Sequence, residues 1–147
     1  MENRYMEYAL KEAQKAYLKN EVPVGAVIVK DGQIIARAHN KKISTNHIFD
    51  HAEILAIKKA ANKIGNWRLN DCEIYVTLEP CPMCASAIQQ SRIKKIYIGT
   101  SSNIENNKEV ILSILNNPQY NHSVDVYYVE NMECSQILSS FFENKRH

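Results

Sequence analysis

Short apolar runs alternate with helical patterns along the whole chain of 147 residues. Apolar residues at helical spacing predict helices near 3–19, 51–64, 82–90, 109–115 and 132–143. Runs rich in β-branched and aromatic residues predict strands at 24–29, 34–40, 73–78, 95–99 and 124–129. Helices that alternate with strands in this way are typical of α/β proteins. We therefore predict a mostly parallel, five-stranded mixed sheet with helices on both faces, a three-layer arrangement.

The first two predicted strands are separated by Asp31-Gly32. An Asp-Gly pair between two β-rich runs is typical of a two-residue hairpin turn, because both turn positions need positive φ. We expect one antiparallel pair at the start of the sheet, and the polar segment 41–50 is predicted to be a loop.

Composition excludes several classes of protein. The length fits one domain, which we assign to 1–147, and 18 basic against 16 acidic residues leave a net charge of +2. That charge is too small to hold nucleic acid by bulk attraction alone. No apolar run approaches the roughly 20 residues of a membrane helix, and the polar N-terminus does not look like a secretory signal. We therefore expect a cytoplasmic protein without a membrane partner.

Three side chains have the chemistry and the spacing of a zinc site. Cys81 and Cys84 are three residues apart at the start of a predicted helix, so one helical turn places both thiols on one side. His51 stands at the start of another predicted helix. Catalytic zinc commonly has three protein ligands and leaves a fourth position open to water. We predict one zinc ion per subunit, held by His51, Cys81 and Cys84.

Glu53 lies two residues after His51. In a regular helix this spacing is about 200° of rotation, so the two side chains share a site only if His51 lies in an irregular first turn. Zinc lowers the pKa of a bound water, and a nearby carboxylate can take its proton and pass it to a leaving amine. We therefore predict that Glu53 is the catalytic acid and base. Such a His-x-Glu pattern followed by Pro-Cys-x-x-Cys is typical of zinc-dependent base deaminases.

Two other interpretations of the cysteines are open. A Cys-x-x-Cys pair can be a redox dithiol, although that role leaves His51 and Glu53 unexplained. A closed structural zinc site needs four protein ligands, for which Cys72 is the candidate. That second case describes a non-catalytic zinc module that binds RNA or a protein partner. Otherwise Cys72 and Cys134 are expected to be ordinary buried residues.

Six segments carry a resemblance that covers nearly the whole chain. They are Glu21-Val22-Pro23-Val24-Gly25-Ala26-Val27, His39-Asn40, His51-Ala52-Glu53-Ile54, Asn66-Trp67-Arg68-Leu69, Val76-Thr77-Leu78-Glu79-Pro80-Cys81 and Ser91-Arg92-Ile93. In these segments the chain resembles the bacterial tRNA-specific adenosine deaminases, within the cytidine/deoxycytidylate deaminase superfamily. The resemblance implies a cytidine-deaminase-like fold, zinc on the three residues above, and proton transfer by Glu53.

The same resemblance implies a substrate and a partner. The target is the wobble adenosine of a tRNA anticodon stem-loop, the product is inosine, and the enzyme is a homodimer. Asn40 is expected to contact the flipped nucleotide, and the other candidate substrate-binding residues are Val22, Ala52, Ser102 and Phe142. Glu79 is expected to be a structural hydrogen-bond partner, and Trp67 and Arg68 are expected to pack around the site.

One loop departs from the family pattern. The family usually has an Arg-Asp pair and then a Gly-rich loop after the fourth strand, where this chain has Thr100-Ser101-Ser102-Asn103 and further polar residues. Ser102 thus stands where the Asp is expected. Because the family uses this loop to hold RNA beside the target base, the alternative substrate is a free nucleobase or nucleoside, such as guanine, cytosine or cytidine.

Overall fold

The computed structural model describes residues 2–145; Met1, Arg146 and His147, which complete the predicted domain, lie outside the described residues. The helices are α1 (Glu2–Leu18), α2 (Lys42–Thr45), α3 (Ala52–Ile64), α4 (Pro82–Gln90), α5 (Asn107–Leu115) and α6 (Met132–Lys145). The strands are β1 (Gly25–Lys30), β2 (Gln33–His39), β3 (Cys72–Leu78), β4 (Lys95–Thr100) and β5 (Asp125–Tyr128). Each predicted helix and strand is present, with ends that differ by at most two residues.

The five strands form one mixed sheet in the order β2-β1-β3-β4-β5. β3, β4 and β5 are parallel, and β1 is antiparallel to both β2 and β3. The prediction of a mostly parallel sheet with a single antiparallel pair was therefore wrong, because two of the pairings are antiparallel. The physical reason is that β1 lies between β2 and β3, so the α3 connection crosses over β1 rather than joining neighbouring strands.

The hairpin between β1 and β2 forms as predicted. Asp31 has φ 52° and Gly32 has φ 76°, and the flanking residues Lys30 and Gln33 are paired. Two successive positive φ values are the signature of the type I′ turn, whose twist matches that of the strands. The hairpin places the end of β2 beside the start of β1.

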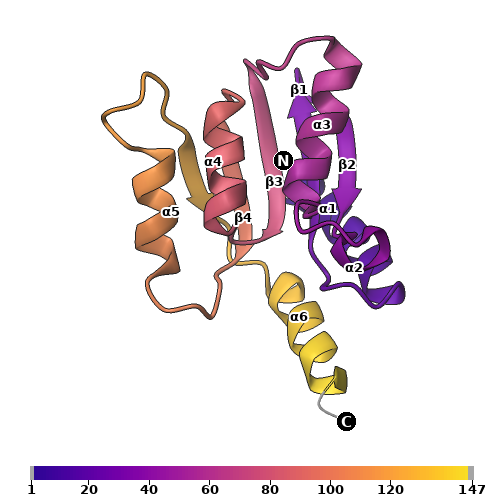
Figure 1. Cartoon of the computed structure of the whole chain (residues 1–147). Coiled ribbons are helices and arrows are strands. Elements are labelled where there is room, and N and C mark those ends of the chain that lie inside the picture. Colours follow the sequence, from indigo (N-terminus) through magenta and orange to yellow (C-terminus); the bar gives the residue numbers. More distant parts are fainter. Residues whose placement is uncertain (1, 146–147) are drawn as a thin grey trace.

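Helices cover both faces of the sheet, as predicted (Figure 1). On one face α3, α4 and α5 pack on the alternating strand residues that include Ile74, Val76 and Ile98. On the other face α1 and α6 cover Tyr75 and Tyr97. Within residues 2–145 there is no helix with the length and hydrophobicity needed to span a bilayer.

The segment predicted as a loop contains one short helix. Residues Lys42–Thr45 form α2, a single turn that ends at Asn46 in the left-handed conformation, with φ 61°. Its N-terminal flanking residue, Lys41, makes no side-chain capping hydrogen bond. The helix is therefore held by contacts from elsewhere in the fold, which matter for the site described below.

Candidate active site

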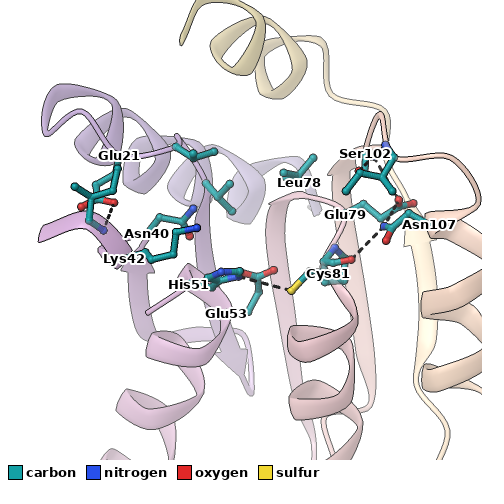
Figure 2. Close-up of a pocket in the computed structure, with 15 residues that line it drawn as sticks. Glu21, Asn40, Lys42, His51, Glu53, Leu78, Glu79, Cys81, Ser102 and Asn107 are labelled. Carbon is teal, nitrogen blue, oxygen red and sulfur yellow. Dashed lines mark hydrogen bonds between the residues drawn. The ribbon is translucent and has the colours of Figure 1, made fainter. Parts of the chain in front are cut away.

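The residues predicted to bind zinc lie at the N-terminal ends of two helices. His51 is the residue before α3 and has an extended backbone, with φ −76° and ψ 152°. Cys81 is the residue before α4, is also extended, and is followed by Pro82 at the first helical position. Figure 2 shows His51 and Glu53 from the α3 side and Cys81 from the α4 side pointing toward one another.

The three ligand atoms are close enough to share one ion. His51 Nδ1 lies 3.7 Å from Cys81 Sγ and 3.4 Å from Cys84 Sγ, and all three ligand atoms lie within 4.8 Å of one another. Tetrahedral zinc with bonds of about 2.0 Å to nitrogen and 2.3 Å to sulfur separates such ligands by about 3.6 Å. The donor set and its spacing therefore fit zinc.

The cluster supplies three protein ligands. Among residues 2–145 its members are His51, Cys81 and Cys84. Cys72 lies at the first position of β3, whereas Cys81 follows the end of that strand. Seven strand residues span about 20 Å, so Cys72 is too distant to be a fourth ligand. It is fully buried, as is Cys134, which confirms the expectation that both are ordinary buried residues.

The ionisable groups of the cluster perturb one another. The Cys84 thiol, donating a hydrogen bond, lowers the pKa of Cys81 to about 4, and His51 acts in the same direction. The same contact and burial raise the pKa of Cys84. The hydrogen bond with Cys81 raises the pKa of His51. The lowered pKa of Cys81 favours its thiolate, which is the form that binds metal ions.

Glu53 lies beside the cluster and is almost completely buried, with 3% of its surface exposed. Burial raises the pKa of Glu53 to about 7. The two side chains share the site because His51 is not part of the regular helix; its extended backbone removes the rotation that would separate them. The predicted condition for their convergence, an irregular first turn at His51, is therefore met.

A cavity of about 200 Å³ opens at the cluster. It is lined by Glu21, Val22, Val24, Asn40, Lys42, Ile43, His51, Glu53, Leu78, Glu79, Pro80, Cys81, Ser102, Ile104 and Asn107. Three of the predicted site residues do not line this cavity, and a fourth lines it and also has a structural role. Cys84 and Ala52 are fully buried behind the wall, Phe142 lines a neighbouring groove, and Asn40 has a second role as a link within the wall.

Asn40 joins the end of β2 to the start of α3. Its side-chain Oδ1 accepts a hydrogen bond of 2.8 Å from the backbone N–H of Ala52, and its own backbone N–H donates to the carbonyl of Val24. The first N–H groups of a helix have no partner within the helix, so Asn40 satisfies one of them. Among the residues whose side chains the structure describes, none accepts a hydrogen bond from its Nδ2 amide, and Asn40 lines the cavity.

Glu79 organises the loop that departs from the family pattern. Its carboxylate accepts hydrogen bonds from the Ser102 backbone N–H (3.3 Å), Asn107 Nδ2 (2.7 Å) and the Tyr128 hydroxyl. These contacts agree with the expected structural role of Glu79. Ser102 Oγ in turn accepts a hydrogen bond of 3.1 Å from the Ile104 backbone N–H. A serine can therefore close the same local turn that an aspartate side chain would close.

A larger groove of about 920 Å³ continues from the cavity toward α6. Leu78, Ser102 and Ile104 line both hollows. The two phenylalanines of α6 differ: Phe141 is buried with its ring edge against Tyr17, whereas Phe142 is 48% exposed on the groove wall. The structure therefore separates a packing residue from one that is accessible to a ligand.

Several wall residues were missed by the sequence analysis. Glu21 is buried, and its carboxylate accepts hydrogen bonds from the backbone N–H groups of Ile43 and Ser44 and from the Ser44 hydroxyl. These bonds hold α2 at the cavity mouth, where it presents Lys42 and Ile43. The available sequence signal for Glu21 was its place in the Glu21-Val22-Pro23 segment, which is part of the family resemblance.

The expectation that Trp67 and Arg68 pack around the site was wrong. They follow the C-terminal end of α3, a helix of 13 residues whose other end carries the cluster. At 1.5 Å per residue the two ends are about 20 Å apart. The Arg68 guanidinium lies 4.5 Å from the centre of the Trp67 ring, so this pair contributes a local surface contact.

Comparisons with known proteins agree with this geometry. Residues 1–100 match the family described as the cytidine and deoxycytidylate deaminase zinc-binding region. The chain is 43% identical over 143 residues to the tRNA-specific adenosine deaminase of Bacillus subtilis, covering 97% of this chain and 89% of that protein.

Two solved structures are similar to the whole fold. One, from a study of A-to-I editing by tRNA:A34 deaminases at the wobble position, has a TM-score of 0.85 and 40% identity, over 92% of this chain and 99% of that one. The other, guanine deaminase from Bacillus subtilis, has a TM-score of 0.66 and 30% identity, over 99% of this chain and 94% of that one.

Proposed function

The chain belongs to the tRNA-specific adenosine deaminases, within the zinc-binding cytidine and deoxycytidylate deaminase family, and from this premise we propose that it converts the wobble adenosine of a tRNA anticodon to inosine. Water replaces the 6-amino group: the C6–N6 bond breaks, a C6–O bond forms, and ammonia leaves. The observation that carries the proposal is the buried Glu53 carboxylate, which lines one cavity with His51 and Cys81 of the three-residue cluster.

We assign the three cluster residues as the zinc ligands. When bound, zinc supplies a water that ionises near neutral pH. Glu53 would take one proton from the attacking water on a carboxylate oxygen and deliver it to N1 of the adenine. It would then take the second proton from the new C6 hydroxyl and deliver it to the departing nitrogen, which leaves as ammonia. Its burial keeps bulk water away from the proton being moved.

The cavity wall orients the base. Asn40 lines the cavity, and we assign its Nδ2 amide to donate a hydrogen bond to the flipped nucleotide. Val22 and Leu78 provide apolar surface for the base. Ala52 acts through its backbone N–H, which keeps Asn40 in place.

The groove beside the cavity fits the rest of the anticodon loop. RNA recognition commonly uses unstacked bases that pack on aromatic side chains. Phe142 presents its ring there, and Ser102 and Ile104 lie where the groove meets the cavity. We assign Phe142 and Ser102 to contacts with nucleotides next to the target base. A small net charge of +2 suits recognition by such local contacts better than attraction of the whole tRNA by bulk charge.

We further propose that the enzyme is a homodimer that acts in the cytoplasm, where its tRNA substrate is found. Ile48 and Phe49 are 67% and 59% exposed on the segment just before His51. Adjacent large apolar side chains at a surface favour an interface with another protein. Light scattering coupled to size exclusion would give twice the 16.9 kDa of one chain, and a mass of one chain would contradict the dimer.

A free nucleobase is the second candidate substrate. The likeness to a guanine deaminase over 99% of the chain favours it, as does the loop with Ser102 in place of an aspartate. Guanine and adenine each carry an exocyclic amine that the same chemistry can remove. Cytosine and cytidine share this property.

The experiment that tests the proposal uses the zinc-loaded protein and an anticodon stem-loop with a wobble adenosine. Nucleoside analysis after incubation should find inosine at that position, and a stem-loop with the adenosine moved out of the wobble position should stay unchanged. Adenosine, cytidine, cytosine and guanine are incubated in parallel. Ammonia from one of these, with the stem-loop unmodified, would replace the tRNA proposal by the second candidate.

A further inference from the structure

A buried acid–histidine pair lies on the opposite face of the sheet from the cavity. Glu12 of α1 is 4% exposed and His39, the last residue of β2, is 6% exposed. Glu12 Oε1 lies 3.0 Å from His39 Nδ1. The chemistry proposed above does not use either residue, and burying two ionisable side chains is costly unless they are paired.

The neighbouring lysines define the protonation of the pair. Lys19 Nζ lies 3.4 Å from His39 Nε2, and Lys15 Nζ lies 2.7 Å from the second oxygen of Glu12. An ammonium group can only donate, so Nε2 is the acceptor and Nδ1 carries the hydrogen that is donated to Glu12. Burial lowers the pKa of His39, which agrees with a neutral ring.

The fold makes room for this pair through Gly25. Gly25 is paired with His39 across the β1–β2 hairpin. A Cβ atom on Gly25 would lie 2.0 Å from the backbone oxygen of Ala9 and 2.8 Å from Glu12 Cβ. Helix α1 therefore lies against the sheet at this glycine, and the close approach places Glu12 over the end of β2.

His39 is the last residue of β2, and Asn40 follows it directly and continues the pairing through the hydrogen bond from its backbone N–H to the Val24 carbonyl. Successive side chains of such an extended chain point to opposite faces of the sheet. His39 is fixed to α1 on one face. Asn40 lies on the cavity wall on the other face, where its Oδ1 holds the Ala52 N–H. The peptide between them is short and stiff, so the position of the histidine fixes where the asparagine side chain begins.

We propose that the Glu12–His39 pair is a positioning device that holds Asn40 in place for the nucleotide. The proposal rests on the function given above for Asn40. Neither residue touches the substrate; the pair acts through the backbone of β2 and through the hydrogen bond that the Ala52 N–H donates to Asn40 Oδ1.

The first test is a mutant cycle with the zinc-loaded enzyme and the stem-loop substrate. His39→Leu removes the donor to Glu12, and we expect it to lower kcat/KM about tenfold, mainly through KM. In an Asn40→Ala background the same change should have little further effect, because the residue that it positions is gone. His39→Asn keeps a donor near the place of Nδ1 and should restore most of the activity. Equal losses in both backgrounds would overturn the proposal.

The second test does not depend on activity. If the pair holds Asn40, His39→Leu should weaken the bond to Ala52, and protection of the Ala52 amide against hydrogen exchange should fall about fivefold. The amide of Ile96, in the core of β4, serves as the internal reference. Unchanged protection at Ala52 would overturn the proposal, whatever the substrate.

Two controls separate positioning from loss of the fold. Lys11→Met alters an exposed side chain on the same helix and should change neither measurement. Should His39→Leu fail to fold, Glu12→Ala takes its place, since it removes the acceptor of the His39 hydrogen bond and keeps the Cβ that packs against Gly25. If the wild-type protein leaves the stem-loop unmodified, the proposed function fails, while the Ala52 measurement still decides on the pair.

Discussion

The side-chain oxygen of Asn40 lies 2.8 Å from the backbone nitrogen of Ala52 and accepts its hydrogen bond. This bond connects the residue directly after β2 with the first residue of α3. His51, the proposed zinc ligand, directly precedes Ala52, so the residue proposed to bind the nucleotide and a residue proposed to bind the metal are fixed to each other. One contact therefore links the proposed nucleotide-binding residue to the start of the helix that follows the proposed metal ligand.

Zinc content should depend on Cys84 and not on Cys72, although both are fully buried. Cys84→Ala removes a ligand atom 3.4 Å from His51 Nδ1 and should reduce the bound zinc well below one ion per chain. Cys72→Ala lies at the other end of β3 and should keep the full zinc content. Elemental analysis of both purified variants provides the measurement, and loss of zinc from Cys72→Ala would contradict the assignment of three ligands.

Replacing Glu53 by glutamine should stop the reaction without removing the metal. The amide cannot accept and return a proton, so kcat should fall by about 10²–10⁴-fold. Zinc content should stay at that of the wild type, because Glu53 is not assigned as a ligand. The exposed Glu109→Gln is the matched control and should keep its activity. Activity of Glu53→Gln above a few per cent of wild type would show that another group moves the proton.

Most of the fold could be predicted because its signals are local. Apolar residues at a period of two or 3.6, Asp31-Gly32 and Pro82 each determine a strand, a turn or a helix start within a few residues. The place of β1 between β2 and β3 could not be predicted from the sequence, because the order of strands is decided by packing between distant segments. Helix α2 was missed for a similar reason: its partner is the carboxylate of Glu21, which lies far from it in sequence.

Glu21 should stabilise the protein at neutral pH and lose this effect in acid. Burial alone would raise the pKa of Glu21, but the hydrogen bonds from Ser44 and Ile43 outweigh burial and leave the pKa below 4.5. A carboxyl group whose pKa is lower in the folded than in the unfolded chain stabilises the fold above the unfolded value. That stabilisation disappears as the pH falls through the folded value.

Urea unfolding of Glu21→Gln measures this effect. At pH 7 the variant should be less stable than the wild type by about 1.5–3 kcal/mol, the range for hydrogen bonds to a charged group. The difference should shrink as the pH is lowered below 4.5. Glu7→Gln, exposed on α1, should show no difference at either pH. A difference that grows in acid would mean that the carboxylate of Glu21 does not hold α2.

The loop that contains Ser102 should loosen when Asn107 is replaced. Asn107 is buried and its side chain bridges Glu79 and the carbonyl of Pro80. Asn107→Leu leaves both acceptors short of a donor, which should cost about 1–3 kcal/mol in unfolding free energy and raise KM for the stem-loop. Asn106→Gly is the control, because Asn106 has φ 63° and no capping side-chain bond. An unchanged KM for the stem-loop would mean that this loop does not take part in substrate binding.

The site itself was only partly predictable. The spacing of His51, Cys81 and Cys84 predicts the donor set, and Glu53 beside His51 predicts the proton carrier, because zinc-dependent hydrolysis needs those residue types. The walls of the cavity come from six separate segments of the chain, and no periodicity connects them. Glu79 is an example: its partners Ser102, Asn107 and Tyr128 meet only in the folded protein.

The position of β1 in the sheet also determines when the catalytic centre can form. The β1–β2 hairpin closes locally through its two-residue turn, but β1 pairs with β3 only after α3 has folded back over the sheet. Contacts between distant segments form slowly, because a long stretch of chain must be ordered first. His51 directly precedes α3, the helix that crosses over β1, whereas Cys81 follows β3, the strand that comes after this helix. During synthesis, the three proposed zinc ligands are therefore not all available until β3 and the start of α4 have left the ribosome.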